Sequence, residues 1–169
     1  MLSTLTTSVL VVLVVIAAAS DLRTRRIPNL LTVGGFVLAL ALRAPLGGSA
    51  LADGFLGAGA ALLLGVPLFA MRALGGGDVK LLAAVGAFAG WSGLLPTLAA
   101  IGIMGGVLGL VEAVRRGVLR QVLANTGRLA LSLATFARYG VRTDLRSPAA
   151  ITVPYGVAIA AGAIVGRLL

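Results

Sequence analysis

The 169-residue sequence contains no cysteine and no histidine. The first absence excludes a disulfide, a thiolate nucleophile and a cysteine-ligated zinc site. The second excludes Ser-His-Asp and Cys-His triads, an HExxH zinc site and haem ligation through histidine. Any chemistry must therefore use carboxylates, hydroxyls, the single lysine Lys80 or the backbone, and neither a metal nor another cofactor is expected.

Charged side chains are also scarce. They make up 11% of the residues, whereas 59% are hydrophobic and the mean hydropathy is +1.09. Soluble domains carry about 25% charged residues. A surface that faces lipid rather than water resolves this deficit, because every helix can then be apolar on its outer side. The composition therefore predicts an integral membrane protein, with the lipid bilayer as its first partner.

Six apolar segments follow one another along the chain, separated by short polar breaks. They cover approximately residues 1–19, 30–42, 51–71, 81–95, 97–114 and 149–166. Their lengths predict an all-α fold with six transmembrane helices in a single domain, residues 1–169. The stretch between the fifth and sixth segments is polar, but residues 118–136 carry apolar side chains at helical spacing. They predict an amphipathic helix on the cytoplasmic membrane surface.

The basic residues indicate how the chain is oriented. If the N-terminus lies outside, all 14 Lys and Arg side chains except Arg43 and Arg167 fall in inside loops or at inside helix ends. This asymmetry satisfies the positive-inside rule and predicts that both termini face outward. The net charge of +9 is then explained by anionic lipid at the cytoplasmic surface, so no nucleic-acid partner is expected.

Two of the five acidic residues are predicted to meet. Asp21 follows the first apolar segment and Asp78 precedes the fourth, so the orientation places both at the cytoplasmic boundary. Taken singly, Asp21 could pair with Arg25 at i+4, and Asp78 could N-cap the helix that follows it. Together they match what a hydrolase without histidine or cysteine needs. Two neighbouring carboxylates share one proton, so that one activates water while the other donates to the scissile carbonyl.

The other three acids are interpreted as structural. Asp53 is predicted to N-cap the third helix. Glu112 is predicted to form an ion pair with Arg115 or Arg116. Asp144 lies in the polar stretch and is predicted to be solvated.

Glycines and a serine lie beside the two candidate acids. Gly75 and Gly77 precede Asp78. Because glycine permits close backbone approach and a positive φ, an extended substrate strand could lie along this segment. A Ser20–Lys80 pair is a second, weaker candidate for a hydrolytic centre.

Three motifs resemble those of the type IV prepilin peptidases. Asp21–Asn29 resembles the first aspartate motif, with its basic stretch and Ile-Pro-Asn. Gly75–Lys80 resembles the GxGD motif followed by lysine, and Pro154–Gly162 resembles the Pro-Tyr-Gly segment of the last helix. The three occur in the expected order along essentially the whole chain.

This resemblance implies that Asp21 and Asp78 are the catalytic pair. The substrates would be prepilin or pseudopilin precursors with a short basic leader, cleaved on the cytoplasmic side of the inner membrane by a multi-pass enzyme. Substrate-binding or supporting roles would fall to Gly75, Gly77, Lys80, Arg23, Pro28 and Asn29. Longer family members carry a four-cysteine zinc domain and methylate the new N-terminus. Without cysteine, the chain is expected to be a small form that lacks the methyltransferase domain.

Two interpretations from other classes remain open. A small proton- or cation-coupled transporter would use Asp21 and Asp78 as ion sites, and predicts acids near the membrane midplane. A non-catalytic assembly protein of a pilus or secretion machine would bind pilin helices through its glycine-rich surfaces. Neither of these, nor the peptidase interpretation, fixes the oligomeric state.

Overall fold

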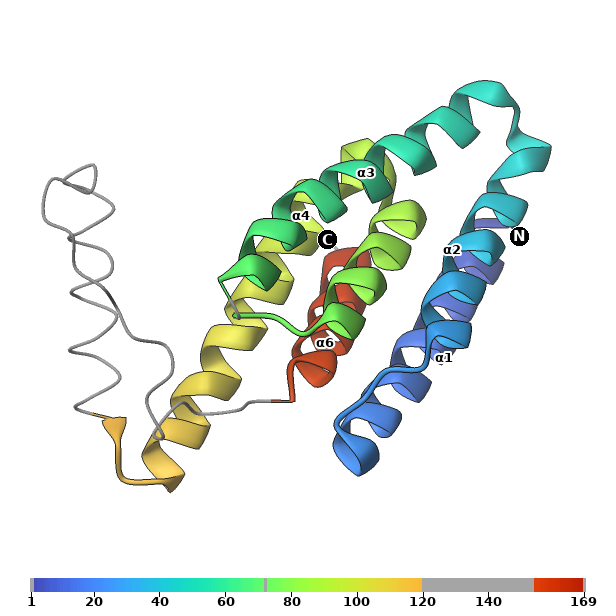
Figure 1. Cartoon of the computed structure of the whole chain (residues 1–169). Coiled ribbons are helices and arrows are strands. Elements are labelled where there is room, and N and C mark those ends of the chain that lie inside the picture. The colour runs from blue at the N-terminus through green and yellow to red at the C-terminus, as the bar shows by residue number, and fades with distance from the viewer. Residues whose placement is uncertain (1, 72, 120–153, 169) are drawn as a thin grey trace, which may run out of the picture. The chain divides into compact units, whose positions relative to one another are not determined.

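A computed structural model describes residues 2–71, 73–119 and 154–168, and the regular secondary structure of these residues is entirely helical (Figure 1). The elements are α1 (Leu2–Thr24), α2 (Asn29–Arg43), the short 3-10 helix η1 (Ala44–Leu46), α3 (Gly48–Ala70), α4 (Gly76–Arg115) and α6 (Tyr155–Leu168). The predicted all-α class is confirmed. From residue 120 onward, the predicted amphipathic helix lies outside the described residues.

The chain divides into two compact units. Met1–Gly105 and Pro154–Leu169 form the first unit, and Gly106–Val153 form the second. The first contains α1, α2, α3, most of α4 and α6, and it holds every residue of the site described below. A single peptidase domain over residues 1–169 stays a prediction.

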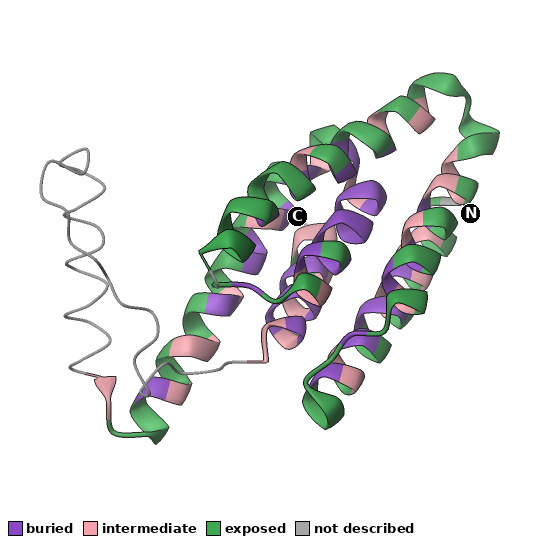
Figure 2. Cartoon of the chain, in the orientation of Figure 1, coloured by how far each residue is buried: buried purple, intermediate pink, exposed green. Residues whose placement is uncertain are grey.

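Four of the described helices are long and apolar enough to cross a membrane: Ser3–Thr24, Asn29–Leu46, Gly48–Ala70 and Gly76–Arg115. Helix α6 is apolar but shorter. Large apolar side chains are exposed on the outer faces, among them Leu63 of α3 at 75% and Leu95 of α4 at 77%. Figure 2 shows exposed residues along most of α3 and a buried first half of α4. The chain is therefore a multi-pass membrane protein, whereas six spans and outward-facing termini stay predictions.

Helix α4 is interrupted at Gly90, where φ is 72° and ψ is 178°. This backbone region is accessible essentially only to glycine. The division predicted at Pro96, between the segments 81–95 and 97–114, was wrong, since Pro96 lies inside the second half of α4. A proline removes one helical hydrogen bond, but it cannot supply the positive φ at which this chain leaves the helix.

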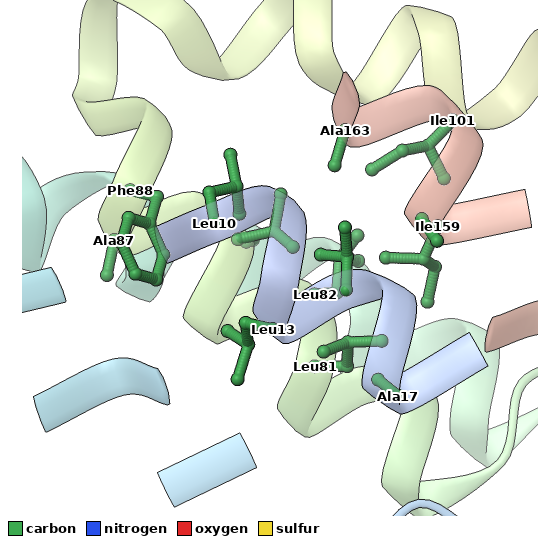
Figure 3. Packing of buried hydrophobic residues seen from close by; sticks show 14 of the residues in the cluster. Leu10, Leu13, Ala17, Leu81, Leu82, Ala87, Phe88, Ile101, Ile159 and Ala163 are labelled. Atoms are coloured by element: carbon green, nitrogen blue, oxygen red, sulfur yellow. The ribbon is translucent and has the colours of Figure 1, made fainter. Parts of the chain in front are cut away.

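The core of the first unit lies between α1, the first half of α4 and α6. Leu13 of α1, Leu81 of α4 and Ile159 of α6 belong to one buried cluster (Figure 3). Small residues bring the helices close, because a Cβ on Gly162 of α6 would collide with the backbone of Ile101. This packing brings the C-terminal end of α1 together with the N-terminal ends of α4 and α6.

Replacing Gly90 with alanine is expected to destabilise the fold by at least about 2 kcal/mol. The new Cβ would need a glycine-only conformation and would also collide with the Asp53 carboxylate and with Arg43 Nη2. Gly47→Ala is the matched control, because Gly47 has φ 100° and open space around it, and about 1 kcal/mol is expected there. Thermal unfolding in detergent, followed through the fluorescence of the single tryptophan Trp91, measures both losses. Equal losses in the two variants would contradict the predicted collision.

Candidate active site

Asp21 lies in the last turn of α1 and is 7% exposed. Its Oδ2 accepts a hydrogen bond of 2.9 Å from the backbone N–H of Gly156, in the first turn of α6. The first N–H groups of a helix have no intrahelical partner, so this carboxylate completes the start of α6. Two ion pairs join described residues, Arg43–Asp53 and Arg116–Glu112. The suggested pairing of Asp21 with Arg25 is not among them.

Asp78 is the third residue of α4 and is partly buried. Its Oδ2 accepts a hydrogen bond of 2.9 Å from the backbone N–H of Gly75, just before the helix. The N-cap position suggested for Asp78 was thus wrong, although the carboxylate does cap the helix, by reaching back from the third position. In both Asp21 and Asp78 the Oδ2 atom is held by a backbone N–H. Among the described residues, no hydrogen bond engages either Oδ1.

Asp21 lies near enough to Asp78 to act on it electrostatically, and Asp78 acts in the same way on the Tyr155 phenol. Three elements that are far apart in the sequence thus contribute to one site: the end of α1, the start of α4 and the start of α6. Within the part of the chain that the structure describes, no three acidic side chains gather as a metal site would require.

The segment between α1 and α2 packs against the start of α4. A Cβ on Gly77 would lie 3.2 Å from the Ile27 Cβ, so glycine lets the two segments pack closely, and a side chain here would require a shift of only a few tenths of an ångström. Lys80 Nζ donates a hydrogen bond of 2.9 Å to Asn29 Oδ1. The first two motifs are therefore joined by one apolar contact and one polar contact. The bond between Lys80 and Asn29 ties α4 to α2, whereas a substrate strand along Gly75 and Gly77 stays a prediction.

Two further expectations, a positive φ at the glycines before Asp78 and a Ser20–Lys80 pair, are not met. The positive φ expected at Gly75 and Gly77 was wrong, since the positive-φ glycines among the described residues are Gly47, Gly90 and Gly117. The Ser20–Lys80 pair is not formed: the Ser20 hydroxyl donates to the Arg26 carbonyl at 2.9 Å, and Lys80 binds Asn29.

Arg23 and Pro28 are both exposed, and their predicted substrate-binding or supporting roles stay predictions. Arg23 is exposed in the last turn of α1, and Pro28 is the exposed residue that precedes α2. No described hydrogen bond or ion pair joins Arg23 to Asp21 or Asp78. The site also contains Gly156 and Tyr155, to which the sequence analysis gave no role. The Pro-Tyr-Gly motif was the signal that marked them.

Comparison with known proteins identifies the family of this chain. Residues 8–110 match the type IV leader peptidase family. The chain belongs to this family. Asp21 and Asp78 lie inside the matched region, whereas the family match does not reach Gly156, which the fold brings onto Asp21.

One relative among curated members of the type IV leader peptidase family is the prepilin leader peptidase/N-methyltransferase of Myxococcus xanthus (strain DK1622). It is 36% identical over 116 residues, which cover 64% of this chain. The matched part spans 35% of that relative, about a third of its length. No solved structure matches the chain.

Proposed function

We propose that this chain is a prepilin leader peptidase in which Asp21 and Asp78 form an aspartic dyad. The observation that carries the proposal is the meeting of these two carboxylates at one end of the helices. Each is fixed through Oδ2 by a backbone N–H, and no described hydrogen bond occupies its Oδ1. Membership of the type IV leader peptidase family supports the same reaction class.

The proposed reaction needs only these two side chains and water. The ionised carboxylate takes a proton from water as its oxygen attacks the scissile carbonyl carbon. The protonated carboxyl donates a hydrogen bond to the carbonyl oxygen, which becomes an oxyanion in the tetrahedral intermediate. A proton then passes from the dyad to the amide nitrogen, the C–N bond breaks, and the proton of the new carboxyl group passes to the new amine as the leader leaves. The dyad ends, as it began, with one proton.

The proposed substrates are prepilin or pseudopilin precursors, cut on the cytoplasmic side of the inner membrane. Arg23, Arg25 and Arg26 follow Asp21 immediately, and such basic clusters remain on the cytoplasmic side of a membrane. With these residues inside, both termini are proposed to face outward. Six spans result if the two halves of α4, which meet at Gly90, each cross the bilayer.

The transporter interpretation is less well supported. Ion-coupling acids in transporters lie near the bilayer midplane, often at breaks within helices. Here Asp21 lies in the last turn of its helix and Asp78 in the first turn of its own. The break within α4 lies at Gly90, away from both acids.

The test is a cleavage assay with the full chain in liposomes and a purified precursor that carries a basic leader and a hydrophobic segment. The expected result is a shortened product whose new N-terminus, read by mass spectrometry, lies at the junction of leader and hydrophobic segment. Empty liposomes are the control, and the product mass also reports whether a methyl group is added. An intact precursor after prolonged incubation would overturn the proposed function.

A further inference from the structure

The break at Gly90 leaves backbone groups that a continuous helix would pair. In a regular helix, Trp91 N–H would donate to the Ala87 carbonyl, four residues earlier. Here Trp91 N–H donates to Asp53 Oδ1 at 3.0 Å, and the Ala87 carbonyl accepts from Arg43 Nε at 2.8 Å. The Phe88 carbonyl accepts from Arg43 Nη2 at 3.1 Å. Both sides of the interruption are thus completed by side chains from other helices.

Arg43 of α2 and Asp53 of α3 also bind each other. Arg43 Nη1 lies 2.8 Å from Asp53 Oδ2, and the Arg43 side chain is only 14% exposed. Asp53 lies within α3, whose N-cap is Gly47, so its predicted capping role was wrong. Within a membrane, irregular backbone persists only where other groups satisfy its N–H and C=O groups. Arg43 and Asp53 therefore satisfy the backbone groups that water would satisfy at a break in a soluble protein.

The first half of α4 connects this pair to the candidate active site. Residues Leu81 to Phe88 are all buried, so packing fixes this stretch from every side. Helix α2 is bound to it at both ends, through Asn29 and Lys80 beside the site and through Arg43 at the break. A lengthwise slip or a rotation of this half of α4 would need both connections to break.

We propose that Arg43 and Asp53 are positioning residues for Asp78. By holding the break at Gly90, they fix the length and rotation of the first half of α4, and so the approach of Asp78 to Asp21. They act from the opposite end of that segment, about 18 Å away at 1.5 Å per residue. The inference rests on the proposed function for its kinetic consequence, but not for its structural one.

Because the chain contains no cysteine, a crosslinking reporter can be introduced without removing native thiols. The Ile27 Cβ and a Cβ built on Gly77 are 3.2 Å apart, and a shift of a few tenths of an ångström brings them into the range of about 3.5 to 4.5 Å that a disulfide needs. The pair Ile27→Cys and Gly77→Cys is therefore expected to crosslink rapidly under mild oxidation in liposomes. Adding Asp53→Asn is expected to slow this crosslinking at least about fivefold, because the start of α4 is no longer held against Ile27.

The kinetic arm uses the chain without cysteines. Asp53→Asn is expected to lower kcat for precursor cleavage about tenfold, with KM nearly unchanged, since misplacing a catalytic group by about 1 Å has effects of this order or larger. Glu112→Gln is the matched control, because it removes the other described ion pair, Glu112–Arg116, and should change neither readout. A KM effect with unchanged kcat would overturn the positioning role.

The outcomes separate the two proposals. If the wild-type chain cleaves no precursor, the proposed function fails, and the crosslinking arm still tests the positioning role. If Asp53→Asn crosslinks at the parental rate, the positioning role is wrong whatever the activity. If Asp53→Asn cannot be purified, Arg43→Lys replaces it, since lysine keeps the charge beside Asp53 but loses the planar donors that bind Ala87 and Phe88. Parental crosslinking in that variant would equally overturn the proposal.

Discussion

Asp21→Asn and Asp78→Asn are each expected to lower kcat for precursor cleavage by at least about 10³-fold. An amide cannot take a proton from water and cannot share a proton with its neighbour, so either change removes the dyad as a unit. Oδ2 of each aspartate accepts a backbone N–H, and the amide oxygen of asparagine can accept the same bond. The variants should therefore fold and insert normally. Initial rates in liposomes, at equal amounts of inserted protein, measure the loss.

The double variant distinguishes a shared-proton pair from two independent groups. Residues that act as a unit are strongly non-additive, so Asp21→Asn with Asp78→Asn should be no slower than either single variant. Glu112→Gln is the control acid-to-amide change, because Glu112 pairs with Arg116 in the second unit and not with the dyad. Cleavage at the wild-type rate by either single variant would refute the dyad. It would favour the assembly-protein interpretation instead.

The pairing of Asp21 with Asp78 was accessible from the sequence because it rests on topology rather than on packing. Two helices that run in opposite directions through a membrane bring the end of one and the start of the other to the same surface. With five acids in the whole chain, each could be weighed separately. The electrostatic influence of Asp21 on Asp78 agrees with that expectation, while their catalytic role stays a prediction.

The position of the break in α4 could not be predicted from the sequence in the same way. Proline is a strong local signal for a helix end, and the predicted segments 81–95 and 97–114 accordingly divided at Pro96. What decides the position is tertiary: Asp53 and Arg43 supply the acceptor and the donors that the interrupted backbone needs. Asp53 was interpreted as a cap for α3, whereas its partners are Arg43 of α2 and Trp91 N–H of α4. Sequence spacing carries no information about contacts of that kind.

The contact between α6 and the dyad depends on a residue with no side chain, which is why its role was missed. Gly156 presents its backbone N–H to Asp21, and the family match ends before it. A titratable or nucleophilic group attracts attention in a sequence, whereas a glycine that allows close approach does so only within a motif. The Pro-Tyr-Gly motif marked this segment of the sequence, and in the fold its glycine binds Asp21 through the backbone N–H.

Gly156→Ala is expected to lower kcat about 10- to 100-fold, with KM little changed. A Cβ at this position would lie 2.9 Å from both the Cβ and Oδ2 of Asp21, so α6 or the carboxylate must move. Either movement lengthens the hydrogen bond from Gly156 N–H and turns Asp21 away from Asp78. Cleavage kinetics in liposomes measure the split between kcat and KM.

Gly102→Ala is the matched control for this change. Gly102 lies in α4 and is exposed, and a Cβ added to it would meet no atom within 4 Å, so alanine should fit without cost. If Gly156→Ala cleaves at the wild-type rate, α6 does not orient Asp21, and the hydrogen bond serves only to complete the helix start. If it loses activity while Gly102→Ala does not, the start of α6 is the third component of the active site, beside the ends of α1 and α4.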